Sequence, residues 1–81
     1  MARRPLWRFI VRTITLKKKE GRRIQRGHPW VFSNELEVVP KDVPPGDAVE
    51  VLDHAGRFLG RGSFNPHTLI AVRLFTRTRE E

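Results

Sequence analysis

The chain has 81 residues, no cysteine and a formal net charge of +7. A chain of this length forms one small domain that buries only about 60 to 65 per cent of its unfolded surface, which argues against a deep private cavity. Without cysteine there is no disulfide framework, thiolate nucleophile or cysteine-based zinc site, and we expect a cytoplasmic protein.

Positive charge is concentrated at the N-terminal end. Residues 1–30 hold ten Lys and Arg against one acid, whereas residues 31–81 hold six against eight. This asymmetry is the electrostatic footprint of a polyanionic partner, and a solvated basic face is the alternative. The first apolar cluster, 9–11, is far too short for a membrane span, so we favour nucleic acid and expect no membrane partner.

The N-terminal elements follow from local patterns. Residues 1–8 contain three arginines, and we expect a flexible basic arm there. Residues 9–17 are rich in β-branched side chains, and Ile14 and Leu16 alternate with threonines, which predicts a half-buried strand. Residues 20–26 allow about two turns of helix, with one apolar residue as its anchor.

That short helix would present several cations. Arg22, Arg23 and Arg26 are spaced three and four residues apart, so their guanidinium groups crowd one side and repel one another. Cations near a helix C-terminus complement its dipole, which accounts for one or two of them. Because Lys17–Lys19 precede the helix, we interpret the whole cluster as phosphate-binding. Gly27 is the residue type preferred just past a helix.

The remainder of the chain predicts short strands joined by turns. Residues 30–39 form a strand that is loosened at Ser33 and Asn34, and the prolines of 40–46 indicate a surface connection. Three further strands follow, with turn signals between them, at 47–53, 57–64 and 69–76. The alternation places Val49 and Val51 on one face of the first and Arg73 outward in the last. These elements describe a mostly β (α+β) domain, a small barrel of about five to six strands with a short basic helix between the first two.

One strand has an unusual face. By the two-residue period, four residues of 57–64 share one face of the strand: Phe58, Gly60, Gly62 and Phe64. Alternating glycines mark a barrel corner or a close approach by something bulky. The occupant is either Trp30, as part of the core, or a nucleotide, and we favour Trp30 because aromatic pairs commonly fill such slots.

Catalytic and metal chemistry have little support. The three histidines are not spaced as a helical pair, and the chain has no cysteine, so we expect no metal site. The aspartates lie in turn contexts, and Ser33 lacks the surroundings of an activated nucleophile. We therefore expect no catalytic residue and no cofactor in this chain.

Several motifs together resemble the PUA domain: Lys17-Lys18-Lys19, Gly21–Arg26, Gly27-His28-Pro29-Trp30-Val31-Phe32, Gly46-Asp47, Gly56–Gly62 and Asn65-Pro66-His67. More narrowly, they resemble the N-terminal domain of class I S-adenosylmethionine-dependent methyltransferases that modify C5 of a cytosine in large-subunit ribosomal RNA. The resemblance covers residues 13–77. It implies a pseudobarrel whose RNA-facing surface is formed by the helix, the loop after it and the second strand.

The resemblance also limits the chemistry. Family enzymes are expected to use a cysteine nucleophile, which this chain lacks, and no Gly-rich cofactor loop opens a helix. S-adenosylmethionine is therefore implied only for a full-length parent. We expect a domain at 9–77, and at 78–81 a tail or the start of a linker to a missing catalytic domain.

Our functional hypothesis is an RNA-binding module that docks structured RNA, with large-subunit ribosomal RNA as partner, as the substrate-recognition domain of an rRNA methyltransferase. The alternative is a stand-alone ribosome-associated or protein-interaction module that binds an acidic partner. Trp30 is left open between a core residue and a base-stacking one, and His28 between an RNA contact and a turn-stabilising hydrogen bond. The expected RNA-binding residues are Lys17, Lys18, Arg22, Arg23, Arg26, Gly27, His28, Trp30 and Arg61.

Overall fold

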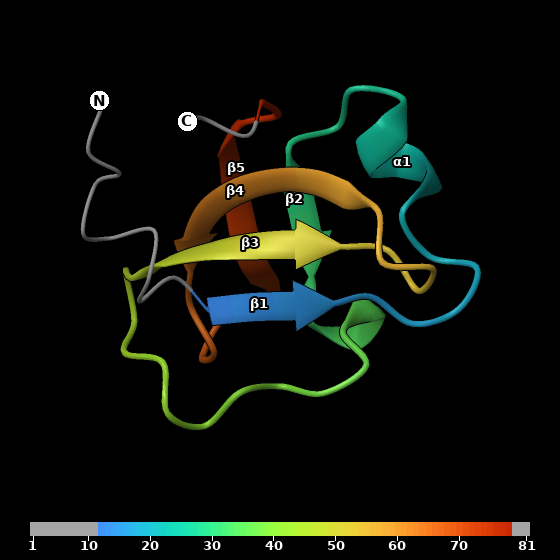
Figure 1. Ribbon diagram of the computed structural model, residues 1–81. Helices are drawn as coiled ribbons and strands as arrows, with labels where there is room; N and C mark the ends of the chain where they lie inside the picture. Colours follow the sequence, from blue (N-terminus) through green and yellow to red (C-terminus); the bar gives the residue numbers. More distant parts are fainter. Residues whose placement is uncertain (1–11, 79–81) are drawn as a thin grey trace, which may run out of the picture.

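The computed structural model describes residues 12–78, and within this range five strands form one mixed sheet (Figure 1). The elements in chain order are β1 (Arg12–Thr15), α1 (Arg22–Gln25), β2 (Trp30–Phe32), the 3-10 turn η2 (Ser33–Glu35), β3 (Ala48–Leu52), β4 (Phe58–Phe64) and β5 (Ile70–Thr76). The predicted mostly β class is confirmed. The arm expected at 1–8 lies outside the described residues.

The sheet has the strand order β1-β3-β4-β5-β2, in which β1 and β3 are parallel and the other neighbours are antiparallel. It does not close into a ring. Its two edges are linked instead beyond the strand ends, where Leu16 forms an isolated bridge with Leu36. Two backbone hydrogen bonds support this bridge, from Lys17 N–H to the Glu35 carbonyl (2.8 Å) and from Glu37 N–H to the Thr15 carbonyl (2.9 Å). The result is a small, curled sheet around one core.

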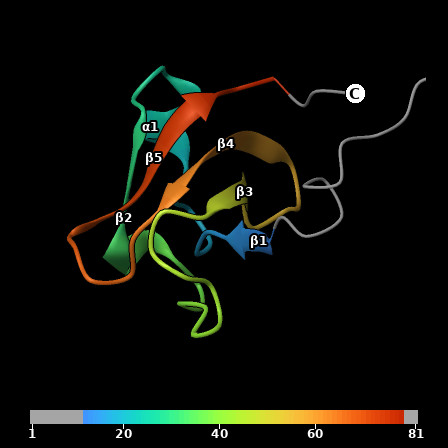
Figure 2. The same ribbon diagram turned by 90° about the vertical axis from the view of Figure 1, so that its left-hand side faces the viewer.

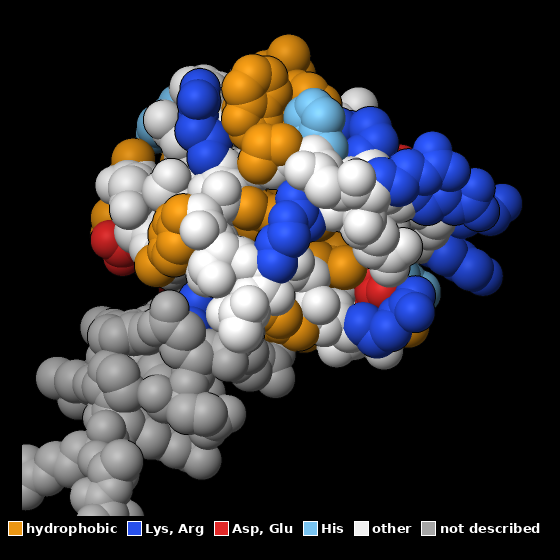
Figure 3. Space-filling view, turned by 90° about the horizontal axis from the view of Figure 1, so that it is seen from above, with side chains coloured by type: hydrophobic (Ala, Val, Ile, Leu, Met, Phe, Trp, Pro, Cys, Tyr) orange, Lys and Arg blue, Asp and Glu red, His pale blue; other side chains and the backbone are white. Residues whose placement is uncertain are grey.

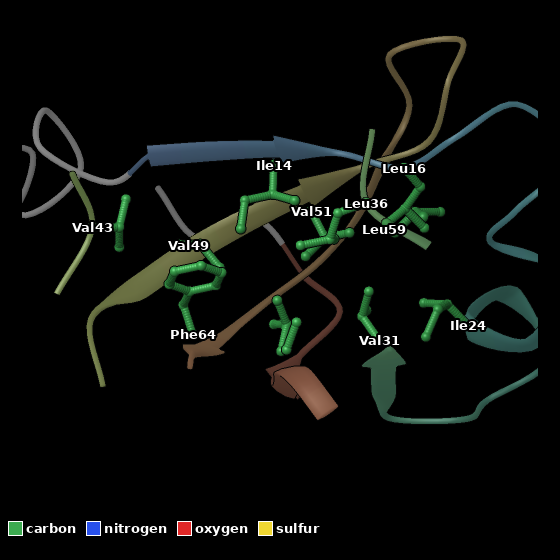
Figure 4. Packing of buried hydrophobic residues seen from close by; sticks show 12 residues of the cluster. Ile14, Leu16, Ile24, Val31, Leu36, Val43, Val49, Val51, Leu59 and Phe64 are labelled. Atoms are coloured by element: carbon green, nitrogen blue, oxygen red, sulfur yellow. The ribbon is translucent and has the colours of Figure 1, made fainter. Parts of the chain in front are cut away.

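The core follows the alternation in the strands (Figure 4). Val49 and Val51 point inward from β3 and are fully buried, as the two-residue period predicts. Ile24 is the residue through which α1 joins this core, and it is also fully buried. Burying a side chain of this size contributes about 1.5 to 3 kcal/mol, so Ile24 holds the single turn of α1 against the sheet.

The glycines of β4 make room for the chain's own backbone. A Cβ atom built on Gly62 would lie 2.2 Å from the carbonyl oxygen of Arg73, and one on Gly60 would lie 2.8 Å from that of Thr76. Both contacts are with β5, which β4 meets where the sheet curls. The expectation that Trp30 fills this slot is therefore wrong, because the neighbouring strand occupies it.

The second strand is shorter than the range 30–39 that the sequence predicts. β2 ends at Phe32, whose N–H donates to the Glu35 carboxylate (2.8 Å), and the chain turns through η2. The predicted loosening at Ser33 and Asn34 corresponds to this 3-10 turn. After it, the connection 36–47 crosses the molecule on the side away from α1 (Figure 1).

Candidate nucleic-acid interface

α1 is a single turn whose end is fixed by backbone geometry. Gly27 has a φ of 111°, and its N–H donates to the Ile24 carbonyl (3.0 Å), while His28 N–H donates to the Arg23 carbonyl (2.9 Å). These two bonds form a Schellman motif, which the sequence indicates through a glycine just past a helix. The loop from α1 to β2 therefore leaves the helix in a defined direction.

A residue of β5's C-terminal end supports the same loop. The Arg77 guanidinium donates to two carbonyls, through Nη1 to Ile24 and through Nη2 to His28 (2.9 Å). The bond to Ile24 adds a side-chain donor to a carbonyl that already accepts from Gly27 N–H, and the bond to His28 holds the loop after the helix. Figure 2 shows the end of β5 beside α1, so this arginine fastens the helix to the sheet. Arg77 was not among the expected site residues.

Exposed cations without acidic partners surround α1. Arg22 and Arg26 are exposed, as are Lys17, Lys18 and Lys19 in the turn before the helix. Within residues 12–78 none of these five side chains forms an ion pair with a carboxylate. Figure 3 shows Lys and Arg side chains gathered at one end of the face seen from above. Their charge is therefore available to an anion from outside.

Arg23 is only partly available. Its Nη2 lies 2.6 Å from Oε1 of Glu35, and its guanidinium carbon lies 4.7 Å from the centre of the Phe32 ring. The Glu35 side chain is 7% exposed and that of Arg23 is 40% exposed. Arg23 therefore links α1 to the β2–η2 segment, and the charge that it offers to a ligand is reduced.

His28 and Trp30 shape the loop after α1. The backbone N–H of Trp30 donates to Nδ1 of His28 (3.2 Å), and the two side-chain rings meet edge-on with centroids 5.7 Å apart. This is the turn-stabilising hydrogen bond that the sequence left open for His28. Trp30 is 38% exposed, so its indole lies on the surface and not in the core.

Arg61 does not belong to this surface. It is one of the expected RNA-binding residues, but it is only 1% exposed. Its Nε and Nη2 lie 2.8 and 2.7 Å from Oε2 of Glu50, which is its direct cross-strand partner on β3. The expectation for Arg61 is corrected for this reason: an acid opposite the arginine draws its side chain into the fold.

A second arginine that is paired with an acid, Arg57, lies in the β3–β4 turn. The Asp53 carboxylate accepts hydrogen bonds from the backbone N–H of Arg57 (2.9 Å) and from its Nε (2.8 Å). The backbone N–H is the main cause of the lowered pKa of Asp53, and the Arg57 side chain adds to it. Beside this turn is an open hollow of about 290 Å³, whose lining includes the cations Lys18, Lys19, Arg22 and Arg57 and the acids Glu20 and Asp53.

Neither a metal-binding cluster nor a membrane-spanning helix is present in residues 12–78. No group of three or more His, Asp and Glu side chains there is placed to hold a metal ion. No helix in the same part of the chain is long and apolar enough to cross a membrane.

Three side chains that are not among the expected RNA-binding residues adjoin the expected surface. Arg73 and Phe75 in β5 and Arg77 just after it are exposed, and the Arg73 guanidinium carbon lies 5.5 Å from the centre of the Trp30 ring. The two-residue alternation was visible in the sequence and placed Arg73 outward. The pairing of β5 with β2, which brings these residues to Trp30, was not visible.

Comparison with known proteins gives a consistent family. The model of the PUA-like domain matches residues 14–77. The chain is similar to proteins named "Ribosomal RNA large subunit methyltransferase I" from Shewanella denitrificans (46% identical over 69 residues), Shewanella frigidimarina (45% over 69) and Pseudoalteromonas atlantica (37% over 68). Each match covers 84% of this chain but 17% of the relative. The chain thus spans about a sixth of the length of these relatives.

Proposed function

Because the chain belongs to the PUA-like domain family, we propose that it is an RNA-binding domain that docks structured ribosomal RNA for an rRNA methyltransferase. Large-subunit rRNA is the proposed partner because the similar proteins carry that RNA in their names. One observation carries the proposal: the exposed cations around α1 have no acidic partner in the described part of the chain.

Phosphates are the groups that this surface is suited to contact. Lys17, Lys18, Arg22 and Arg26 are exposed and available, and Arg23 adds a shared charge from the same helix. At Gly27 a Cβ atom would meet nothing within 4 Å, so the backbone there is open to a ligand. Contacts of this kind position RNA through its backbone and make affinity fall with salt.

The methyl-transfer chemistry would belong to another part of a longer protein. S-adenosylmethionine is commonly held by a glycine-rich loop that opens a helix, but Gly60 and Gly62 lie inside β4 and pack against β5. These residues do not fit the cofactor. We therefore assign this chain the recognition of the substrate. We further propose that the RNA-binding domain spans 9–77 and that it functions in the cytoplasm.

A second candidate function rests on the same charges. An acidic protein of the ribosome or its assembly apparatus would also be attracted to exposed arginines and lysines. RNA is favoured because of the family and because the exposed Trp30 ring lies beside the Arg73 guanidinium, an arrangement typical of RNA-binding surfaces.

The two candidates are separated by competition. Fluorescence anisotropy with labelled fragments of large-subunit rRNA is measured in the presence of heparin or an acidic protein at raised salt. We expect one RNA fragment to remain bound while equal charge concentrations of the competitors fail to displace it. Equal displacement by heparin would reduce the surface to a nonspecific polyanion site, and preferential binding of the acidic protein would support the second function.

A further inference from the structure

The outward face of β5 continues into that of β2. Trp30 lies directly opposite Arg73 in the antiparallel register, so both side chains leave the same face of the sheet. Phe75 follows Arg73 by two residues and therefore lies on this face as well. Trp30, Arg73 and Phe75 together are called the aromatic face below.

Two large rings are left in contact with solvent on this face. Phe75 is 65% exposed and Trp30 is 38% exposed, and they are the aromatic members of the exposed large hydrophobic side chains in residues 12–78. Figure 3 shows a hydrophobic group beside a histidine, with Lys and Arg side chains on either side. Exposed aromatic surface next to cations indicates a binding function.

The indole is held in its exposed position. The backbone N–H of Trp30 donates to Nδ1 of His28, and the His28 ring meets the indole edge-on. The Arg73 guanidinium carbon lies 5.5 Å from the centre of the indole ring. Arg77 ties the end of β5 to the carbonyls of Ile24 and His28. The aromatic face is therefore joined rigidly to the α1 cations, and both surfaces can contact one ligand.

We propose that the aromatic face is a platform on which unpaired RNA bases stack, so that the RNA recognised here is single-stranded or looped where it meets β2 and β5. This inference rests on the proposed function and specifies its substrate class. Every base has a π face, and stacking on Trp or Phe is largely independent of sequence. In a duplex those faces are covered by neighbouring base pairs, and the major groove of A-form RNA is too narrow to admit side chains.

Charge favours RNA over a protein as the occupant of this face. The charged residues in 70–78 are Arg73 in β5 and Arg77 just after it, and both are cationic. Arg23 in α1 and Arg26 at its end add further cations. A guanidinium beside a stacked base can also reach the phosphate that follows it. Nucleotides supply a ring and an anion at each step, which matches this alternation of rings and cations.

The test uses the fluorescence of Trp30. The chain has two tryptophans, so Trp7→Phe leaves Trp30 as the sole reporter. Single-stranded oligoribonucleotides from large-subunit rRNA are titrated into this variant and compared with the same sequences annealed to their complements. We expect strong quenching and tight binding with the single strands, and weak quenching with the duplexes.

A second variant tests the face without the reporter. Phe75→Ala is compared with Leu69→Ala, which removes another exposed apolar side chain (70% exposed) from the turn at the opposite end of β5. Losing one stacking partner should weaken single-strand binding about five- to one-hundredfold, whereas Leu69→Ala should leave it unchanged.

The outcomes separate this inference from the proposed function. If RNA binds in a salt-dependent way but Phe75→Ala behaves like Leu69→Ala and duplexes quench Trp30 equally, the stacking platform is overturned and the RNA-binding function stands. If neither single strands nor duplexes bind at low salt, both proposals fail. Weaker capture of an acidic protein by Phe75→Ala, with RNA binding unchanged, would assign the face to a protein and overturn the inference.

Discussion

Arg22 and Arg26, at the two ends of α1, differ from Arg57 and Arg61, before and within β4, in one respect: within residues 12–78, only the second pair of arginines forms ion pairs with acids. Arg57 and Arg61 lie beside Asp53 and Glu50 and are bound to them, at 2.8 and 2.7 Å. Arg22 and Arg26 have no such neighbour within residues 12–78. The same side chain is thus a structural element in one region and a free charge in the other.

This difference teaches that a count of basic residues does not measure a binding surface. Where an acid lies opposite in the sheet or four residues away, the fold uses the positive charge. Where cations form no ion pair with an acid, they repel one another and their charge can bind an external anion. Arg23, which shares Glu35 with the backbone of Phe32, is intermediate between the two cases.

The largest expected effect comes from breaking the ladder pair. Arg61→Gln removes the guanidinium that pairs with the Glu50 carboxylate, and loss of one partner of a buried pair costs about 3 to 5 kcal/mol. The free energy of unfolding, measured with urea, should fall by that amount. RNA affinity of the folded fraction should not change, because Arg61 is buried.

The matched control for this change is Arg12→Gln. Arg12 pairs with Asp42 at 2.6 Å, but both side chains are 59% exposed, and exposed pairs contribute only about 0 to 1 kcal/mol. Equal losses of stability in the two variants would contradict the distinction between a buried and an exposed arginine–carboxylate pair. Weaker RNA binding by folded Arg61→Gln would contradict the assignment of Arg61 to the fold.

A smaller effect is expected at the end of α1. Gly27 has a φ of 111°, so Gly27→Ala should cost about 1 kcal/mol in stability and shift the loop that carries His28 and Trp30. Gly46→Ala is a suitable comparison because Gly46 also has a positive φ (92°) and open space around it, but lies in the connection away from α1. Chemical denaturation should show similar losses for both variants.

RNA affinity should distinguish the two glycine variants. We expect it to fall in Gly27→Ala, where the cationic helix and the loop change their relative positions, and to stay constant in Gly46→Ala. If both variants bind RNA as the unmodified chain does, the geometry of the helix end is irrelevant to binding.

Local features were the ones that the sequence could predict. Gly27 after a basic run indicated the end of α1, and the alternation at Val49 and Val51 indicated the inner face of β3. Both are set by residues close in the chain. The single apolar residue of the helix, Ile24, was expected to be its anchor and is fully buried.

Features that depend on strand pairing were beyond such reasoning. Burial of Arg61 follows from Glu50 being its cross-strand partner, and the slot at Gly62 is filled by the backbone of β5 where the sheet curls. Trp30 reaches Arg73 only through the β2–β5 register. Each of these contacts joins residues far apart in sequence, and no local pattern specifies which strands become neighbours.

The most direct test of the central claim is the salt dependence of RNA binding. If Lys17, Lys18, Arg22 and Arg26 each contact one phosphate, the four contacts, at about −0.7 each, give a slope of about −2.8 in a plot of log affinity against log salt concentration. In the double variant Arg22→Gln/Arg26→Gln the slope should become shallower by about 1.4 and the affinity should fall. The control is Lys41→Gln, which removes an exposed cation from the connection away from α1 and should bind RNA as the unmodified chain does. An unchanged slope and affinity in the double variant would show that the free charge of α1 does not bind RNA.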